Sequence, residues 1–487
     1  MARKLILLLL ALPAALAAAC ESAFDPNGTF LSNFAKTNSC YLIPMSVGAG
    51  HGLAGDLNAV YNVALFKRNP NYELIVVGYF PEARFMGLSS YDDHWVAAGS
   101  IDDHDIVPIT DRMQNPYKSG ATYTANQKYA AVVSFGGTQP ASISPGCGYD
   151  GVNLRSNVMT VMDRHTTPNW TGYPNLPRAF PAHQTGLTDA GSVFVRTYLP
   201  ATSNPPNALR PSIIVRDLST GCAVTADSAL NALQLVSVSD IEVFHPWLSV
   251  DQIHSHYNFQ NTILSRTCYG LDPLSRLRWF RGGEYVPGDN PVASYSNGQL
   301  QAATVSQLRT DSRGLYLRIR FKAPGVPQYP CTGCAFDDAA DLRYWSISFG
   351  NLGTTFASLA DNTLVKDPFG YVTLIVNLNP AFGRPTQVTA ENGYNYVDLS
   401  TAPEIDTLSA ISLRQILPSA SHSRCASAQI PFYATEYNDQ GGLMGEYVPA
   451  VDIRTASQLP RIVDHLNQGD TCGLQPTTEP SACTANP

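Results

Sequence analysis

The stretch that decides the fold occurs twice in the sequence, first as Ala83-Arg-Phe-Met-Gly-Leu-Ser89 and again as Leu342-Arg-Tyr-Trp-Ser-Ile-Ser348. Each copy has the length and the apolar and aromatic content of a buried strand. Side chains alternate between the two faces of a strand, so the arginine at the second position shares a face with the apolar residues two and four positions later. The sequence therefore predicts two related strands, one in each half of the chain.

Two further blocks repeat in the same order. Ser100–Val107 matches Ser358–Val365, and Val195–Pro200 matches Leu413–Pro418. Three blocks at similar spacing indicate an internal duplication, and we therefore expect two homologous β domains. The first copy is longer because of the Pro- and Gly-rich stretch Pro140–Gly191, which we interpret as an insertion loop.

The duplicated blocks place two arginines, Arg84 and Arg343, and two aspartates, Asp103 and Asp361, at matched positions. An arginine beside apolar neighbours needs a partner, because burying an unpaired charge is costly. We expect an ion pair inside each domain, Arg84 with Asp103 and Arg343 with Asp361. A role for Arg343 in holding a ligand oxygen is the alternative.

Short runs rich in β-branched and aromatic residues recur between Pro and Gly turn signals, which favours sandwiches or barrels. The runs are Glu73–Tyr79, Tyr129–Ser134, Ser192–Tyr198, Ser212–Arg216, Leu315–Phe321 and Tyr371–Asn377. Helical patterns are few, and Gly55–Lys67 and Val451–Asn467 are the candidates. The predicted fold is all-β, with two tandem homologous β-sandwich (jelly-roll-like) domains and a few short helices.

The predicted domain organisation has five parts. Residues 1–19 are a signal peptide, and residues 20–242 form the first β-sandwich domain with its insertion loop. Residues 243–284 link the domains, residues 285–455 form the second sandwich, and residues 456–487 hold a C-terminal helix and a Cys-containing tail.

The signal peptide has a basic start, a short apolar run and a small-residue exit at Ala17-Ala18-Ala19. No other apolar stretch approaches the roughly 20 residues of a membrane span. A net charge of -8 without basic runs disfavours nucleic-acid binding.

The ten cysteines, an even number, predict disulfides whose connectivity stays open. Asn27-Gly-Thr and Asn169-Trp-Thr are N-glycosylation acceptors, so we expect a secreted or secretory-pathway glycoprotein carrying N-glycans.

Carboxylates and imidazoles are dense between Tyr91 and Asp105, where two Asp-Asp-His units lie ten residues apart. Such units can hold a divalent cation. The second unit, however, belongs to the repeated block, whose other copy reads Ala-Asp-Asn, so we predict no metal site. His94 and Trp95 belong only to the first domain and are better functional candidates than His104. Trp247, in the His-rich linker, is a candidate wall of an apolar cavity.

The sequence holds one match to a cofactor-binding motif and neither of two common hydrolase motifs. Gly50-His-Gly-Leu-Ala-Gly55 matches a dinucleotide fingerprint, but the chain does not alternate strands and helices as that site requires. A Gly-x-Ser-x-Gly elbow and a His-Glu-x-x-His helix are both absent from the sequence. We predict no cofactor.

The blocks Tyr79–Asp93 and Asp341–Ser348 resemble a broad group of exported, uncharacterised microbial β proteins. With its signal peptide, cysteines and glycan sites, the whole chain also resembles the fungal hetero-Diels–Alderases of tropolone–sesquiterpenoid pathways. The resemblance lies in overall build and implies joining an o-quinone methide to a humulene-type polyene without a cofactor.

That chemistry needs an apolar pocket that aligns two small apolar substrates and a few hydrogen-bond donors to polarise the dienone oxygen. It also calls for an acid–base group that removes water from a hydroxymethyl precursor. The candidate catalytic donors are Arg343, His94 and Tyr91, and the candidate substrate-binding walls are Trp95, Trp247 and Trp345.

Two other function classes stay open. A secreted lectin-like protein would bind its ligand without turnover on a shallow aromatic surface. A glycoside hydrolase would need two carboxylates about 5 Å or about 6.5–9.5 Å apart across a cleft.

Overall fold

The computed structural model describes thirteen stretches of the chain, some of them with internal gaps of one to three residues. They are residues 42–45, 55–91, 97–138, 152–161, 190–224, 232–235, 264–266, 274–276, 279–282, 293–299, 302–327, 340–427 and 444–459. The predicted signal peptide, most of the interdomain linker and the C-terminal tail lie outside them.

The first half of the chain forms two sheets, with strand orders β1-β2-β8-β4-β5 and β7-β6-β3-β9. Their bounds are β1 Ile43–Met45, β2 Ala59–Lys67, β3 Tyr72–Tyr79, β4 Ala83–Tyr91, β5 Ala97–Asp102, β6 Lys128–Ser134, β7 Val158–Thr160, β8 Ala190–Pro200 and β9 Ser212–Asp217. Part of the predicted insertion loop thus contributes β7.

The second half forms two sheets with the orders β12-β13-β19-β15-β16 and β18-β17-β14-β20, and β10 pairs with β11 in a separate hairpin. The bounds are β10 Leu264–Arg266, β11 Leu274–Arg276, β12 Trp279–Gly282, β13 Ala293–Gln299, β14 Leu315–Lys322, β15 Leu342–Gly350, β16 Thr355–Ala360, β17 Tyr371–Asn377, β18 Tyr394–Asp398, β19 Ala410–Pro418 and β20 Ala450–Thr455. Helical segments are α6 Ala302–Thr310 and the 3-10 turns η4 Ile405–Thr407, η7 Gly445–Tyr447 and η8 Ala456–Gln458.

The strand orders of the two halves correspond position by position. Strand β4 pairs with β5 and β8, just as β15 pairs with β16 and β19. The parallel pair β6–β7 has its counterpart in the parallel pair β17–β18. Leu199 and Leu417, each followed by the proline that ends its strand, both adopt positive φ, at 46° and 48°. These shared details support the duplication inferred from the sequence.

In each half the two sheets pack face to face around one apolar core, as in a β-sandwich. The first core joins Met86 and Leu88 of β4 to Val76 of β3 and neighbouring strands. The second core joins Trp345 and Ile347 of β15 to strands of the opposite sheet. The faces predicted for the duplicated strands are therefore confirmed.

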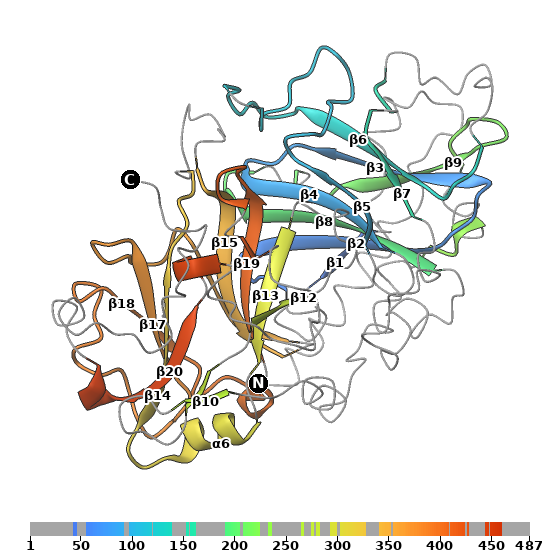
Figure 1. The fold of residues 1–487 in the computed structure, drawn as a ribbon. Coiled ribbons are helices and arrows are strands. Elements are labelled where there is room, and N and C mark those ends of the chain that lie inside the picture. Colours follow the sequence, from blue (N-terminus) through green and yellow to red (C-terminus); the bar gives the residue numbers. More distant parts are fainter. Residues whose placement is uncertain are drawn as a thin grey trace, which may run out of the picture.

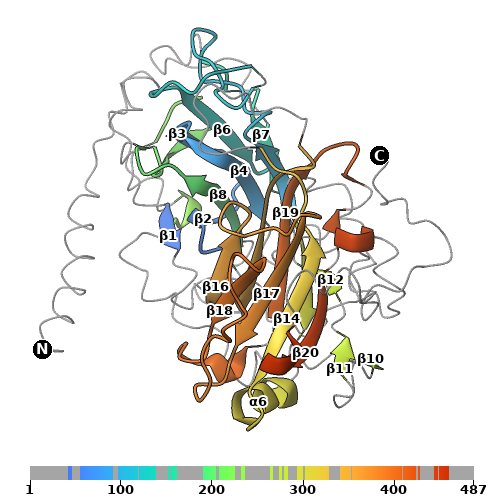
Figure 2. The same cartoon turned by 90° about the vertical axis from the view of Figure 1, so that its left-hand side faces the viewer.

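The outer faces of β4–β8 and β15–β19 meet between the halves. Phe85 and Tyr198 from the first half pack with Tyr344 and Ile416 from the second, and the Tyr198 and Tyr344 ring centroids lie 5.1 Å apart. Figures 1 and 2 show the blue-to-green strands of the first half above the yellow-to-red strands of the second. We call this contact the interface.

The all-β prediction is confirmed, and all six predicted strand runs are strands. The helix prediction for Gly55–Lys67 is wrong, because Ala59–Lys67 forms β2. The prediction for Val451–Asn467 is wrong over Val451–Thr455, which belongs to β20, and residues 460–467 lie outside the described residues. Both segments pair along their length with a neighbouring strand, and this tertiary pairing outweighs a weak helical pattern. The second half's sheet starts at β12, before the predicted boundary at residue 285.

Cys222 in the described part forms a disulfide bond, in agreement with the expectation from the even cysteine count. Of the segments that the structure describes, no helix has the length and apolar character needed to cross a membrane.

Candidate functional site

The duplicated arginines and aspartates form ion pairs that cross the interface. Arg84 Nη1 lies 3.2 Å from Asp361 Oδ1, and Arg343 Nη1 lies 3.8 Å from Asp103 Oδ1. The expectation of one pair inside each domain is therefore wrong. The two copies face each other across the interface, so each arginine at the start of its strand meets the aspartate turn of the opposite copy.

The pair formed by Asp103 and Arg343 is largely buried. The Asp103 side chain has no exposed surface, and that of Arg343 is 5% exposed. Burial raises the pKa of Asp103 to about 7, although the Arg343 charge and the backbone N–H of Met86 act in the opposite direction. Burial likewise raises the pKa of Asp361, against the Arg84 charge. Both carboxyls are thus held between a desolvating interface and a neighbouring guanidinium.

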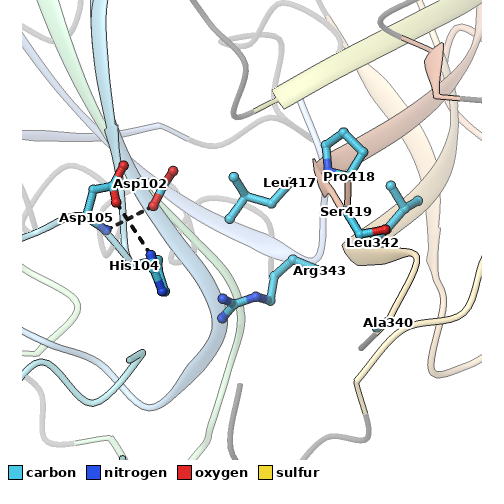
Figure 3. Close-up of a pocket in the computed structure, with 9 residues that line it drawn as sticks. All are labelled: Asp102, His104, Asp105, Ala340, Leu342, Arg343, Leu417, Pro418 and Ser419. Atoms are coloured by element: carbon cyan, nitrogen blue, oxygen red, sulfur yellow. Dashed lines mark hydrogen bonds and ion pairs between the residues drawn. The ribbon is translucent and has the colours of Figure 1, made fainter. Parts of the chain in front are cut away.

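A pocket of about 190 Å³ opens beside the Asp103–Arg343 pair, at the junction of the two halves. Its lining residues are Asp102, His104, Asp105, Ala340, Leu342, Arg343, Leu417, Pro418 and Ser419. The polar groups of the first half stand on one side, and the second half contributes the guanidinium and an apolar strip. Figure 3 shows Arg343 reaching from its strand toward His104.

The first-half wall of the pocket is the tight turn Asp102–Asp105. The Asp105 N–H donates to Asp102 Oδ1 at 3.1 Å, and His104 Nδ1 lies 3.4 Å from Asp105 Oδ1. Burial and the neighbouring Asp105 charge raise the pKa of Asp102. The turn thereby presents an imidazole between two carboxylates, which is a usable acid–base arrangement.

The ligand-type atoms of Asp102, His104 and Asp105 all lie within 4.8 Å of one another. That spacing alone would suit a divalent cation. Arg343, however, places a permanent positive charge on the opposite wall of the same pocket. The pocket thus combines two carboxylates and an imidazole on one wall with a guanidinium on the other, an arrangement that can also take part in proton transfer.

Among the sequence-predicted site residues, Arg343 lines the pocket and Tyr91 does not. Tyr91 is 2% exposed. Its hydroxyl accepts a hydrogen bond of 2.5 Å from Arg196 Nη2, and its ring packs edge-on against Phe194. Its phenol is therefore engaged within the first half's own sheet.

Trp345 lies in the core of the second sandwich and has no exposed surface. Its ring packs edge-on against Phe321 at 5.3 Å, and its indole N–H donates to the Pro324 carbonyl. Trp345 lies on the same strand as Arg343, but its side chain belongs to the core and does not line the pocket. The predicted sites His94, Trp95, Trp247, Asn27 and Asn169 lie outside the described residues.

The sequence favours His94 over His104 as a functional residue, yet His104 lines the pocket. A usable signal was present in the duplication. The second copy keeps Asp361 but has Asn362 where the first copy has His104. Because the second copy has asparagine at this position, the shared fold does not require the His104 imidazole.

A second polar cluster fastens the interface without lining the pocket. Asp56, which has no exposed surface, accepts hydrogen bonds from Tyr344 Oη at 2.6 Å and Ser346 Oγ at 2.5 Å. Arg414 Nη1 donates to the hydroxyls of Tyr61 and Tyr198 at 2.6 and 2.7 Å. Burial raises the pKa of Tyr61 and of Tyr344 well above 10, so both phenols stay protonated.

No family model and no curated protein sequence matches this chain. A crystal structure of an uncharacterised protein from Burkholderia cenocepacia is similar over 83% of this chain and 79% of that one, at 13% identity and a TM-score of 0.37. A protein from Vibrio parahaemolyticus is similar over 82% of this chain and 90% of its own, at 12% identity and a TM-score of 0.36. The B domain of a biofilm associated protein is similar at 8% identity, over 88% and 84% of the two chains, with a TM-score of 0.16.

Proposed function

We propose that this chain is a secreted, cofactor-free hetero-Diels–Alderase that joins an o-quinone methide derived from a tropolone or polyketide to a humulene-type sesquiterpene. We place the reaction in the interface pocket. The observation that carries this proposal is the pocket's composition, in which the Arg343 guanidinium faces the Asp102–Asp105 turn beside apolar side chains. The resemblance of the whole chain to that enzyme family points to the same chemistry.

The pocket meets the needs of the reaction in physical terms. A dienone oxygen gains negative charge as the cycloaddition proceeds, and a largely buried guanidinium that lines the pocket can donate hydrogen bonds to it. Leu342, Leu417 and Pro418 provide an apolar surface for the flat ring. Holding the two reactants in contact removes most of the entropic barrier of a bimolecular step.

The size of the pocket sets the substrate arrangement. Its volume of about 190 Å³ is below the ~300–1,000 Å³ of sites that enclose a drug-sized ligand. It therefore suits the ring reactant alone, and the polyene would approach from the mouth of the pocket. The face of the ring turned toward the mouth would then decide the stereochemistry of the product.

The test is a turnover assay on the secreted, glycosylated full chain. The protein receives a hydroxymethyl tropolone and a humulene alcohol, and the adducts are separated by chiral chromatography. The proposal predicts one stereoisomer, formed faster than with boiled protein, and loss of this selectivity in Arg343→Gln. A racemic product at the uncatalysed rate in the wild type would refute it.

A lectin-like binding protein without turnover is the second candidate. The small volume of the pocket and the exposure of Asp105, whose side chain is 72% exposed, favour it. It predicts saturable binding of a small ligand with an unchanged reaction rate. A glycoside hydrolase is less well supported, because Asp102 and Asp105 belong to one turn and do not face each other across a cleft.

A further inference from the structure

The proposed cycloaddition leaves three polar side chains of the interface pocket without a role. The reaction uses the Arg343 guanidinium and the apolar strip, whereas Asp102, His104 and Asp105 line the opposite wall. The His104 side chain is 38% exposed and that of Asp105 is 72% exposed, so a ligand that enters the pocket can reach both. A ligand that contacts both walls must therefore match these three side chains as well as the guanidinium.

The fold does not require the three side chains, because the duplicated turn Ala360–Thr363 has alanine, asparagine and threonine in their place. In both copies the buried aspartate accepts a hydrogen bond from a backbone N–H of the neighbouring strand, at 3.0 Å for Asp103 and 3.2 Å for Asp361. The backbone hydrogen bond that closes the turn is also kept, at 3.1 Å in the first copy and 3.0 Å in the second. Since the second copy forms the turn without them, the two carboxylates and the imidazole can serve binding.

The spacing of the three side chains fits a primary ammonium group. Their ligand-type atoms, one each from Asp102, His104 and Asp105, all lie within 4.8 Å of one another. Acceptors placed around a tetrahedral ammonium at ~2.8 Å from its nitrogen lie roughly 4.6 Å apart. An ammonium has three N–H donors, each carboxylate accepts, and a neutral imidazole has one acceptor nitrogen. One ammonium can therefore reach acceptors on all three residues.

A positive charge at this wall would also offset two effects that disfavour the ionised Asp102 carboxylate. Burial raises the pKa of Asp102, and the negative charge of Asp105 raises it further. A cation close to both carboxylates compensates for the lost hydration of the first and for its repulsion by the second. The first-half wall of the pocket therefore favours the amine end of a ligand.

The opposite wall favours a carboxylate. Arginine has five N–H donors in a planar fork, so the Arg343 guanidinium can face Asp103 and the pocket at the same time. A carboxylate can accept from such a fork through both of its oxygens. Figure 3 shows the guanidinium end of Arg343 directed toward the turn. Leu417 and Pro418, from the same half as Arg343, line the pocket and suit an aliphatic group.

We infer that the interface pocket binds an aliphatic α-amino acid, with its ammonium on the Asp102–Asp105 turn, its carboxylate on Arg343 and its side chain against Leu417. A ligand with a single charge would match only one of the two walls. The volume of about 190 Å³ limits the ligand to one small molecule, since sites for drug-sized ligands have ~300–1,000 Å³. This site goes beyond the proposed function, and the amino acid and the ring reactant would compete for Arg343.

The experiment is isothermal titration calorimetry of the full chain with L-valine, in buffer that contains EDTA. We expect saturable binding with a Kd below about 1 mM. Isobutylamine lacks the carboxylate of valine and isovalerate lacks its ammonium, so each should bind at least about tenfold more weakly. Absence of valine binding would overturn the inference, and so would equal affinity for either analogue. Binding that appears only when Zn²⁺ replaces EDTA would also overturn it, because the turn would then hold a metal ion.

Variants test whether valine occupies this pocket. Asp102→Ala and Asp105→Thr install the residues with which the second copy forms the same turn, so both should fold and bind valine at least about tenfold more weakly. The control Glu391→Gln removes a negative charge from an exposed position outside the pocket and should leave the Kd within about twofold. An unchanged Kd in both turn variants would place valine at another site and overturn the inference.

The titration and the coupling assay fail separately. Valine binding together with racemic coupling would support the inference and refute the proposed function. Stereoselective coupling without valine binding would have the reverse meaning. If both hold, valine should inhibit the coupling competitively, because the two ligands need the same guanidinium.

Discussion

At the scale of single residues, Asp103 is a buried carboxyl of the interface whose ionisation affects its stability. Its pKa is about 7 in the folded protein, whereas an aspartate in an unfolded chain titrates near ~3.9. The folded state therefore holds this proton more tightly than the unfolded state. The stability that Asp103 contributes is fully present below about pH 4 and is lost as the pH rises through about 7.

We predict that Asp103→Asn flattens the fall of the unfolding free energy between about pH 4 and pH 7, because asparagine does not ionise. Urea unfolding at several pH values measures this slope. The control Glu391→Gln changes an exposed carboxyl and should leave the slope as in the wild type. An equal slope in Asp103→Asn and the wild type would show that Asp103 does not titrate in this range.

Trp345 offers a second prediction for a single residue, since its position decides between a core role and a ligand-binding role. Truncating a buried tryptophan to alanine typically costs about 3–5 kcal/mol of unfolding free energy. We expect that loss for Trp345→Ala, and less than about 0.5 kcal/mol for Phe369→Ala, whose side chain is 52% exposed. Equal stability of the two variants in denaturant unfolding would contradict the core position.

At the scale of elements, the segment before β2 fastens the first half to β15 of the second. Asp56→Ala removes the acceptor of the Tyr344 and Ser346 hydroxyls, which would then be buried without it. We predict a loss of about 2–4 kcal/mol in chemical unfolding. Asn58→Ala removes a 2.9 Å contact to the same carboxylate within the segment and should cost less than about 1 kcal/mol. A larger cost for Asn58→Ala than for Asp56→Ala would refute this role.

At the scale of the whole molecule, the ion pairs Arg84–Asp361 and Arg343–Asp103 couple the stability of one half to that of the other. A double-mutant cycle of Arg84→Met with Asp361→Asn should show a coupling free energy of at least about 1 kcal/mol across 277 residues of sequence. The same cycle between Arg84 and Asp103 should give less than about 0.5 kcal/mol. A larger coupling energy for Arg84 with Asp103 than for Arg84 with Asp361 would contradict the ion pair across the interface.

The strands and their correspondence between the two halves could be predicted from the sequence. Strand runs such as Leu315–Phe321 have a high local β propensity, and the repeated blocks indicate which strand of the first half matches which strand of the second. The partner of Arg84 could not be predicted, because Asp103 and Asp361 have equal chemistry and only the packing of the halves selects one. The local pattern of Gly55–Lys67 predicts a helix, and the strand at Ala59–Lys67 depends on a long-range pairing with β8 that this pattern does not contain. The position of His104 in the same pocket as Arg343 likewise depends on the packing of the two halves.

A crystal structure of the full chain soaked with tropolone shows whether the interface pocket binds the ring substrate. We expect one tropolone with its oxygens facing the Arg343 guanidinium and its ring between Leu417 and the Asp102–Asp105 turn. Tropolone bound at another site, with this pocket empty at saturating ligand, would refute the proposed function.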